Sequence, residues 1–297
     1  MTMRMLTISS LLLLAACTTT LTPTPTPLRA LDAPPFVRPS NFKGVVLIVL
    51  ENTDPDEAAA MAFVRALPNA VQFRQYYALA HPSRPNYVGI VSGSIDGING
   101  DREPRPPLTR RHLGDLLDAA GIDWRVYAED YPNDCGRSDK KGAYARRHLG
   151  FLDFADVQGA KCSHITTTTA LTADVAAGRV PPFALVIPNN EHNGHNRGPA
   201  SADAWLQTRF APLLANRAFT DGRLFVITYD EDEGHDARPN RVLLVAWGDP
   251  VQPPSEPSTL DVTYDHYDLL RTLESLLGVG TLGAHDDVAR PFGGIWR

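Results

Sequence analysis

Runs of apolar residues that stop abruptly at polar residues organise this chain. Residues 45–50 are six consecutive apolar residues, four of them β-branched, and Glu51 and Asn52 follow at once. Such a run is typical of a strand that is buried on both faces of a sheet. Residues 183–188 and 224–228 repeat the design, and each leads into further amides or carboxylates. Because ligands bind beyond the carboxyl ends of the strands in open α/β sheets, we expect these polar residues at one functional edge.

The same pattern predicts helices and two further strands. Helices are expected over residues 55–67, 109–120, 202–214 and 266–277, and strands over residues 124–128 and 242–247. Asp54, Thr109 and Asp265 are the expected N-caps, and Gly121 and Gly278 suit helix ends. Strands that alternate with helices predict a three-layer α/β/α sandwich with a mainly parallel central sheet.

The N-terminal segment has the composition of an export signal followed by a linker. A basic residue precedes the apolar run 6–16, which is too short to span a bilayer, and Cys17 follows it. This junction resembles the bacterial lipoprotein box, in which the cysteine is lipidated; an ordinary cleaved signal peptide is the alternative. Residues 17–41 are rich in Thr and Pro and predict an extended tether. We therefore expect a signal peptide over residues 1–16, one domain over residues 42–297, and an exported protein held at a membrane, in the periplasm or at the cell surface.

Composition narrows the function classes. The chain has 297 residues, of which 43% are hydrophobic and 21% charged, and a formal net charge of -6. These values suit a globular chain with one large core. An acidic chain without an extended basic cluster predicts no nucleic-acid partner. Cys135 and Cys162 remain after Cys17, and in an exported protein we expect them to form a disulfide.

The segment HPSRPNY, residues 81–87, is the first candidate for chemistry. Two prolines restrict the backbone around Ser83, and Pro85 suits the first turn of a helix, where N–H groups favour a bound phosphate. Serine is a weak nucleophile at its own pKa and must be activated. Glu51 and the acidic run over residues 230–236 offer the oxygen ligands of an activating metal ion. The alternative is that Ser83 only caps a helix.

The segment PNNEHNGH, residues 188–195, is the second candidate. It places His192 and His195 just past a predicted buried strand. Such a loop can bind phosphate oxygens, protonate a leaving group or ligate a metal ion. Two histidines three residues apart favour a site over an ordinary loop.

In chain order, these motifs resemble the bacterial phosphoesterase family. The resemblance is carried by Glu51-Asn52, residues 81–87, residues 188–195, Asp230-Glu231-Asp232 and residues 264–274, with support from residues 127–132, 144–148 and 203–206. It covers residues 44–282. The family includes secreted acid phosphatases and phospholipases C, and it implies the alkaline phosphatase superfamily fold. The family's His-Asn-Pro-Phe is HLGF here, at residues 148–151, and Asn193 and Glu231 stand where the family often has aspartate.

The resemblance also implies a phosphoryl-serine intermediate and a set of site residues. Ser83 would be the nucleophile, and His148 and His195 would contact the phosphate or act as general acid. The expected metal ligands are Glu51, Asn52, Asp230 and Glu231. The expected substrate-binding residues are Asn52, His81, Asn86 and His192. Because all these metal ligands offer oxygen, a divalent Ca, Mg or Mn ion is favoured over Zn.

Three functions follow from these expectations. The first is a metal-dependent phosphomonoesterase of the acid phosphatase type, acting on a phosphorylated small molecule or lipid headgroup. The second is a phospholipase C-like diesterase, and the chain's length favours the monoesterase. The third is a non-catalytic solute-binding lipoprotein, which would not require carboxylates clustered with Ser83 and two histidines.

Overall fold

The computed structural model describes residues 33–234 and 239–297. The predicted signal segment, Cys17 and most of the predicted tether lie outside the described residues. Residues 33–41, which were expected in the tether, lie against the domain. Arg38 Nε donates to the carbonyl of Leu276 at 2.7 Å, and the rings of Phe36 and Trp296 meet edge to face at 6.0 Å. Residues 33–41 therefore belong to the packed structure.

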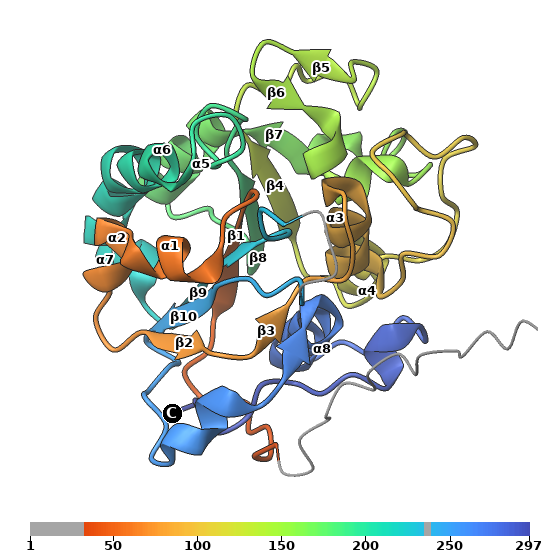
Figure 1. The fold of residues 1–297 in the computed structure, drawn as a ribbon. Coiled ribbons are helices and arrows are strands. Elements are labelled where there is room, and N and C mark those ends of the chain that lie inside the picture. Colours follow the sequence, from red (N-terminus) through yellow and green to blue (C-terminus); the bar gives the residue numbers. More distant parts are fainter. Residues whose placement is uncertain (1–32, 235–238) are drawn as a thin grey trace, which may run out of the picture.

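A seven-stranded sheet forms the middle layer of the molecule (Figure 1). Its strands are β1 (Gly44–Leu50), β2 (Val71–Phe73), β4 (Trp124–Ala128), β7 (Ile165–Thr167), β8 (Phe183–Ile187), β9 (Arg223–Tyr229) and β10 (Leu244–Gly248). Their order is β2-β10-β9-β1-β8-β4-β7. Among these strands, β10 runs antiparallel to its neighbours β9 and β2, and the other pairs are parallel. The predicted strands and the mainly parallel sheet are thus confirmed.

Strand β1 is the centre of the sheet. All seven of its residues are buried, and it pairs with β8 on one side and β9 on the other. Helices cover both faces of the sheet, so both faces of β1 must be apolar. This is why its sequence is a continuous apolar run and does not alternate.

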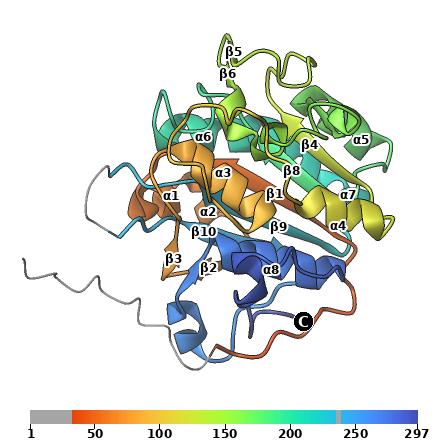
Figure 2. The same cartoon turned by 90° about the vertical axis from the view of Figure 1, so that its right-hand side faces the viewer.

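Helices form the two outer layers (Figures 1 and 2). One face carries α3 (Ser83–Ser92), α4 (Leu113–Ala119) and α8 (His266–Leu277). The other carries α1 (Pro55–Ala60), α2 (Ala62–Arg65), α5 (Thr168–Ala176), α6 (Pro199–Trp205) and α7 (Arg217–Thr220). Two small sheets pair β3 (Tyr76–Tyr77) with β11 (Tyr264–Asp265), and β5 (Lys140–Lys141) with β6 (Tyr144–Ala145). The predicted three-layer α/β/α sandwich is confirmed.

The helix predictions hold best where the end signals are local. Helix α8 begins after Asp265, whose side chain accepts from two backbone N–H groups, and it ends at Gly278 in the left-handed region. The helix expected from Thr109 begins later, because His112 is its N-cap. The His112 N–H donates to the carboxylate of Asp115 at 2.9 Å, which closes the first turn.

Contacts between distant segments change the other two predicted helices. The helix expected over residues 55–67 breaks at Met61, because the Asp203 carboxylate accepts from the N–H groups of Ala62 and Phe63 at 3.1 and 2.8 Å. The helix expected over residues 202–214 begins at Pro199 and changes at Leu206–Phe210 into a π-helical turn.

The predicted disulfide is confirmed. Cys135 and Cys162 are bonded, with 5.4 Å between their Cα atoms. Across residues 33–234 and 239–297, no helix has the length and apolar character needed to cross a membrane.

Candidate active site

Two neighbouring strands and one helix bring the candidate residues together. Leu50 of β1 is in register with Tyr229 of β9. The next residues along each strand, Glu51 and Asp230, therefore emerge side by side at the carboxyl edge of the sheet. Helix α3 begins at the same place with Ser83. The edge predicted from the apolar runs is the edge at which the polar residues gather.

Ser83 is the first residue of α3 and is 2% exposed. Its Oγ lies 3.2 Å from Glu51 Oε2 and 3.3 Å from Glu231 Oε1. The N-cap is Pro82, and no side chain caps the helix. The alternative that Ser83 only caps a helix is therefore wrong, because its hydroxyl faces two carboxylates.

Glu51 is fully buried and is held on both carboxylate oxygens. Tyr87 donates its hydroxyl to Oε1 at 2.5 Å, and His148 Nε2 lies 3.2 Å from Oε2. Burial, followed by the nearby charge of Asp230, raises the pKa of Glu51 well above its usual range. Burial lowers the pKa of His148 well below its usual range. The His148 ring is thus neutral and stacks on Tyr87 at a centroid distance of 5.3 Å.

Asp230 and Glu231 complete a buried group of three carboxyls with Glu51. Burial raises the pKa of Asp230 to about 7. Burial and the charge of Asp230 raise the pKa of Glu231 to about 9. His81 Nδ1 contacts Glu231 Oε2 at 2.7 Å. Ionising several buried carboxyls together is unfavourable unless positive charge compensates them.

The donor set around Asp230 fits a hard divalent cation. Asn52 has a left-handed backbone with φ of 44°, and its N–H donates to Asp230 Oδ1 at 3.3 Å. Asp230 Oδ2 and Asn52 Oδ1 are buried and have no hydrogen-bond partner among the described residues. Buried oxygens without donors, beside carboxyls with raised pKa values, are the ligands that Ca, Mg or Mn prefers. Asp236, at the far end of the predicted acidic run, lies outside the described residues.

The expected substrate contact at Asn86 is not supported by the structure. Asn86 is fully buried. Its Oδ1 accepts from the N–H groups of Leu79 and Ala80, and its Nδ2 donates to the Ala80 carbonyl at 2.7 Å. The amide is therefore occupied in holding the loop that leads to Ser83. His81, in contrast, is partly exposed and reaches Glu231 and Asp232 from the side of the site.

The loop after β8 approaches Glu51 very closely. The Glu51 N–H donates to the Asn193 carbonyl at 2.9 Å. Gly194 has φ of 109°, and a Cβ there would lie 2.7 Å from the Glu51 carbonyl oxygen. Only glycine satisfies both conditions. This contact carries His192 and His195 to the rim of the site.

The two loop histidines have different surroundings. His192 Nδ1 lies 2.9 Å from Glu129 Oε2, and Glu129 follows β4, which β8 separates from β1. His195 is exposed, and its Nε2 lies 3.1 Å from Arg147 Nη2. A guanidinium only donates, so His195 Nε2 must be the accepting nitrogen. The His195 ring is 6.1 Å from His148.

Arg147 was not among the site residues predicted from the sequence. Its side chain is 21% exposed, and besides His195 it contacts Asp101, with Nε 3.4 Å from the carboxylate. The Arg147 charge lowers the pKa values of Glu51 and Tyr87, so it acts on the buried centre. Arg147 directly precedes His148, a predicted site residue, and this was the feature of the sequence that could have indicated it.

His266 contacts the backbone of the acidic centre at Asp230. It is fully buried, Nε2 lies 2.9 Å from the Asp230 carbonyl oxygen, and Nδ1 lies 2.8 Å from the Tyr76 hydroxyl. A carbonyl only accepts, so Nε2 carries the proton and Nδ1 accepts from Tyr76. Burial lowers the pKa of His266 to about 4, so the ring is neutral. Its role is to fix the backbone of Asp230.

A second acidic group lies elsewhere in the described part of the chain. His112, Asp115 and Asp156 offer ligand atoms within 4.8 Å of one another. The ammonium of Lys161 already contacts Asp115 and lies 3.0 Å from Asp156. This cluster is thus compensated by a side chain, and we assign no metal ion to it.

Comparisons with known proteins agree with the fold and the motifs. A family model described as the Phosphoesterase family matches residues 56–280. A probable acid phosphatase of Kluyveromyces lactis is 31% identical over 255 residues, covering 82% of this chain and 60% of its own. An acid phosphatase of Aspergillus fumigatus is 28% identical over 85% of this chain and 60% of its own. A phosphatidylinositol-3-phosphatase of Mycobacterium tuberculosis is 31% identical over 86% of this chain and 83% of its own. The chain spans about 60% of the length of the first two relatives.

Solved structures show the same fold at low sequence identity. A protein in the alkaline phosphatase superfamily from Vibrio parahaemolyticus has a TM-score of 0.56 at 15% identity, over 91% of this chain and 75% of its own. The C-terminal periplasmic domain of EcEptC from Escherichia coli has a TM-score of 0.53 at 12% identity, over 87% of each chain. The sandwich is thus the alkaline phosphatase superfamily fold, as the motifs implied.

Proposed function

Because the chain belongs to the phosphoesterase family, we propose that it is a metal-dependent phosphomonoesterase of the acid phosphatase type. The observation that carries the proposal is the convergence of Glu51 and Glu231 on the Ser83 hydroxyl, beside Asp230. A serine that only stabilises a helix has no need of buried carboxyls. The relatives described as acid phosphatases and as a phosphatidylinositol phosphatase support a phosphate ester as substrate.

Glu51, Asn52, Asp230 and Glu231 would hold the metal ion. When bound, a divalent cation supplies positive charge that stabilises the developing negative charge on the phosphoryl oxygens. The same charge would keep the buried carboxyls ionised, which reverses the rise in their pKa values.

Ser83 is the proposed nucleophile. Its Oγ forms a bond to phosphorus while the bond between phosphorus and the ester oxygen breaks, and its proton passes to Glu51 or Glu231, both within 3.3 Å. The N-terminus of α3, with no side-chain cap, directs its N–H groups towards the phosphoryl oxygens. A water molecule then cleaves the phosphoserine and restores the hydroxyl.

Arg147 and His195 are the proposed phosphate and leaving-group contacts. An incoming phosphate attracts the Arg147 guanidinium, which now donates to His195. Release of that hydrogen bond frees His195 Nε2 to hold a proton and to pass it to the leaving oxygen. His148 is neutral and buried, so its proposed role is to position Glu51.

Hydrolysis of a chromogenic phosphomonoester and of a choline phosphodiester, across pH and with and without a chelator, tests the proposal. Monoester cleavage that is lost on chelation and regained with a divalent metal ion is the expected result. Cleavage of the diester alone would favour the phospholipase C-like alternative. If neither ester turned over with metal restored, the solute-binding alternative would replace the enzyme.

We further propose that the protein is exported and anchored to a membrane through lipidated Cys17. The sequence of the N-terminal segment supports this. Radiolabelled palmitate should be incorporated by the wild-type chain and not by Cys17→Ala. Equal labelling of both chains would contradict the anchor.

A further inference from the structure

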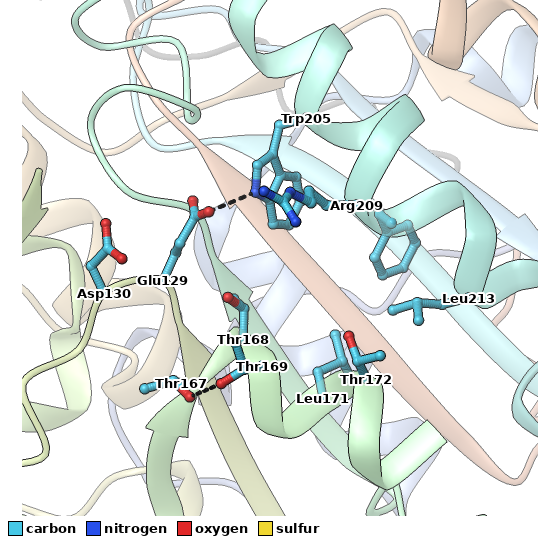
Figure 3. A pocket seen from close by; sticks show the side chains of 11 residues that line it. Glu129, Asp130, Thr167, Thr168, Thr169, Leu171, Thr172, Trp205, Arg209 and Leu213 are labelled. Atoms are coloured by element: carbon cyan, nitrogen blue, oxygen red, sulfur yellow. Dashed lines mark hydrogen bonds between the residues drawn. The ribbon is translucent and has the colours of Figure 1, made fainter. Parts of the chain in front are cut away.

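A pocket of about 330 Å³ lies at the same edge of the sheet, beyond β4 and β7 (Figure 3). Its walls come from the start of α5, from α6 and the π-helical turn Leu206–Phe210, and from Glu129 and Asp130 after β4. None of its lining residues is a proposed metal ligand or phosphate contact. Its volume is at the lower end of the range for small-molecule sites, which suits a single ring.

One wall of the pocket offers donors without partners. The Arg209 guanidinium has no hydrogen bond or ion pair within residues 33–234 and 239–297, and neither do the hydroxyls of Thr168 and Thr172. Arg209 lies on the π-helical turn, a conformation that is rare and frequent at functional sites. Figure 3 shows the Thr168 and Arg209 side chains facing the same space from opposite helices.

The other wall offers acceptors. Glu129 Oε1 accepts from Trp205 Nε1 at 3.2 Å, and Asp130 Oδ2 accepts from Asn189 Nδ2 at 2.6 Å. Each carboxylate has two oxygens with several lone pairs, so both retain accepting capacity. Trp205 and Leu213 add apolar surface between the polar groups.

The mixture of donors and acceptors selects a class of ligand. A free anion would meet the carboxylates of Glu129 and Asp130, and a cation would meet Arg209, so a singly charged group suits neither wall. A hydroxyl both donates and accepts, and a ring that carries several hydroxyls also has an apolar face. We propose that this pocket binds a polyhydroxylated ring, such as a sugar or a cyclitol.

The pocket is connected to the reaction site through Glu129. Its Oε2 lies 2.9 Å from His192 Nδ1, on the loop that also carries His195. Strands β1 and β4 are separated by β8, so Glu51 and Glu129 follow strand ends about 10 Å apart. The ring is therefore either part of a large phosphate ester cleaved at Ser83 or a separate ligand beside it. Only the first case rests on the proposed function.

Binding is tested first, on the full chain, with myo-inositol and D-glucose and their monophosphates as probes in titration calorimetry. Wild type is expected to bind at least one of these rings. Arg209→Gln and Thr172→Val should each weaken that binding, Arg209→Gln by roughly tenfold. Arg65→Gln is the matched control, because Arg65 is exposed on α2 and forms no side-chain bond within the described residues.

Kinetics then distinguish the two sources of the ring. If the ring belongs to the substrate, Arg209→Gln raises KM for ring phosphates and leaves KM for a small aryl phosphate unchanged. If the ring is a separate ligand, both KM values stay the same while binding is lost. The proposed ring site would be contradicted if wild type bound none of the rings, or if neither variant weakened the binding. If wild type binds the ring but cleaves no phosphate ester, the result would count against the proposed function and not against the pocket.

Discussion

Ser83 and Arg84 are neighbours at the start of α3, yet their side chains enter two different buried clusters. The Arg84 guanidinium pairs with fully buried Asp153, and Arg146 contacts the same carboxylate and Glu103, the latter at 2.9 Å. Every acid in that cluster has an arginine partner.

The cluster around Ser83 has the opposite balance. Glu51, Asp230 and Glu231 are at most 2% exposed. Their ion-pair partners within the described residues are histidines and include no lysine or arginine. Two buried clusters of similar size thus differ in whether the protein supplies its own positive charge.

This difference separates structure from function. A buried charge is stable when it is paired, and a buried acid without a cation lowers stability. A protein retains such an acid where a ligand supplies the missing charge. Substitutions in the unbalanced cluster are therefore expected to change the binding of metal ions and phosphate. Substitutions in the balanced cluster are expected to change the free energy of unfolding.

The largest expected effect is on turnover. Ser83→Ala should lower kcat by about 10³-fold or more, because no other hydroxyl replaces the nucleophile, while inorganic phosphate still binds. Steady-state kinetics and phosphate inhibition measure both. Ser92→Ala is the control, since Ser92 is buried at the other end of α3 and donates only to backbone carbonyls. Activity retained by Ser83→Ala would remove Ser83 from the mechanism.

The balanced cluster should respond in stability. Arg146→Met leaves Glu103 and Asp153 with less positive charge, and it should lower the free energy of unfolding by roughly 3 kcal/mol. Urea unfolding measures this loss. Adding Glu103→Gln should recover part of it, because Glu103 loses Arg146 and keeps only the exposed Arg105, whereas Asp153 keeps Arg84. An unchanged unfolding midpoint in Arg146→Met would mean that the pairs contribute nothing.

Divalent metal ions should stabilise the unbalanced cluster. A metal ion that binds the folded state alone, at 100 times its Kd, adds about 2.7 kcal/mol to the free energy of unfolding. Thermal unfolding with Ca, Mg or Mn should show a rise in Tm for wild type and none for Asp230→Asn. Asp139→Asn is the control, because Asp139 is 82% exposed. Equal rises in Tm for wild type and Asp230→Asn would place the metal ion elsewhere.

Arg147 provides a smaller test of the same site. Arg147→Gln should weaken inhibition by inorganic phosphate about tenfold, through loss of a charge-assisted contact. Arg147→Lys should recover part of the affinity, since the charge returns without the forked geometry. If Arg147→Gln binds phosphate as wild type does, the guanidinium belongs only to the His195 contact.

A third buried acid group is intermediate between the two, because its arginine is distant and partly exposed: Arg271 Nη1 lies 3.6 Å from Glu274 Oε2. Glu274 is fully buried beside Asp286, and burial, followed by the charge of Asp286, raises the pKa of Glu274 to about 9. In an unfolded chain the pKa of a glutamate side chain is about 4.3. The folded state thus holds an extra proton between these pH values, so stability falls as pH rises through that window.

Glu274→Gln removes this pH dependence. At pH 8 the variant should be more stable than wild type, because it has no carboxyl that ionises on unfolding, and the gain should vanish near pH 4. Calorimetry across pH measures the difference. Activity should be unchanged, because Glu274 lies on α8 and contacts none of the proposed site residues. A gain that is independent of pH would show that Glu274 holds no extra proton.

Local sequence patterns were sufficient for several features of this protein. The apolar run of β1 predicts a doubly buried strand, because burial on both faces excludes polar residues. Asp265 and Gly278 predict the ends of α8, because capping depends on a few adjacent residues. Polar residues after β1 and β9 predict the edge of the site, because parallel strands end together. The motifs in their chain order predicted the family.

Tertiary structure alone decided how those residues are used. Asp203 caps α2 from 141 residues away and so divides a predicted helix. Asn86 lies within the predicted catalytic motif, residues 81–87, but its side chain hydrogen-bonds to the backbone of the preceding loop. Arg147 joins the site through His195, 48 residues away in sequence. Each outcome depends on which distant group comes within hydrogen-bond distance, and neither periodicity nor capping carries that information.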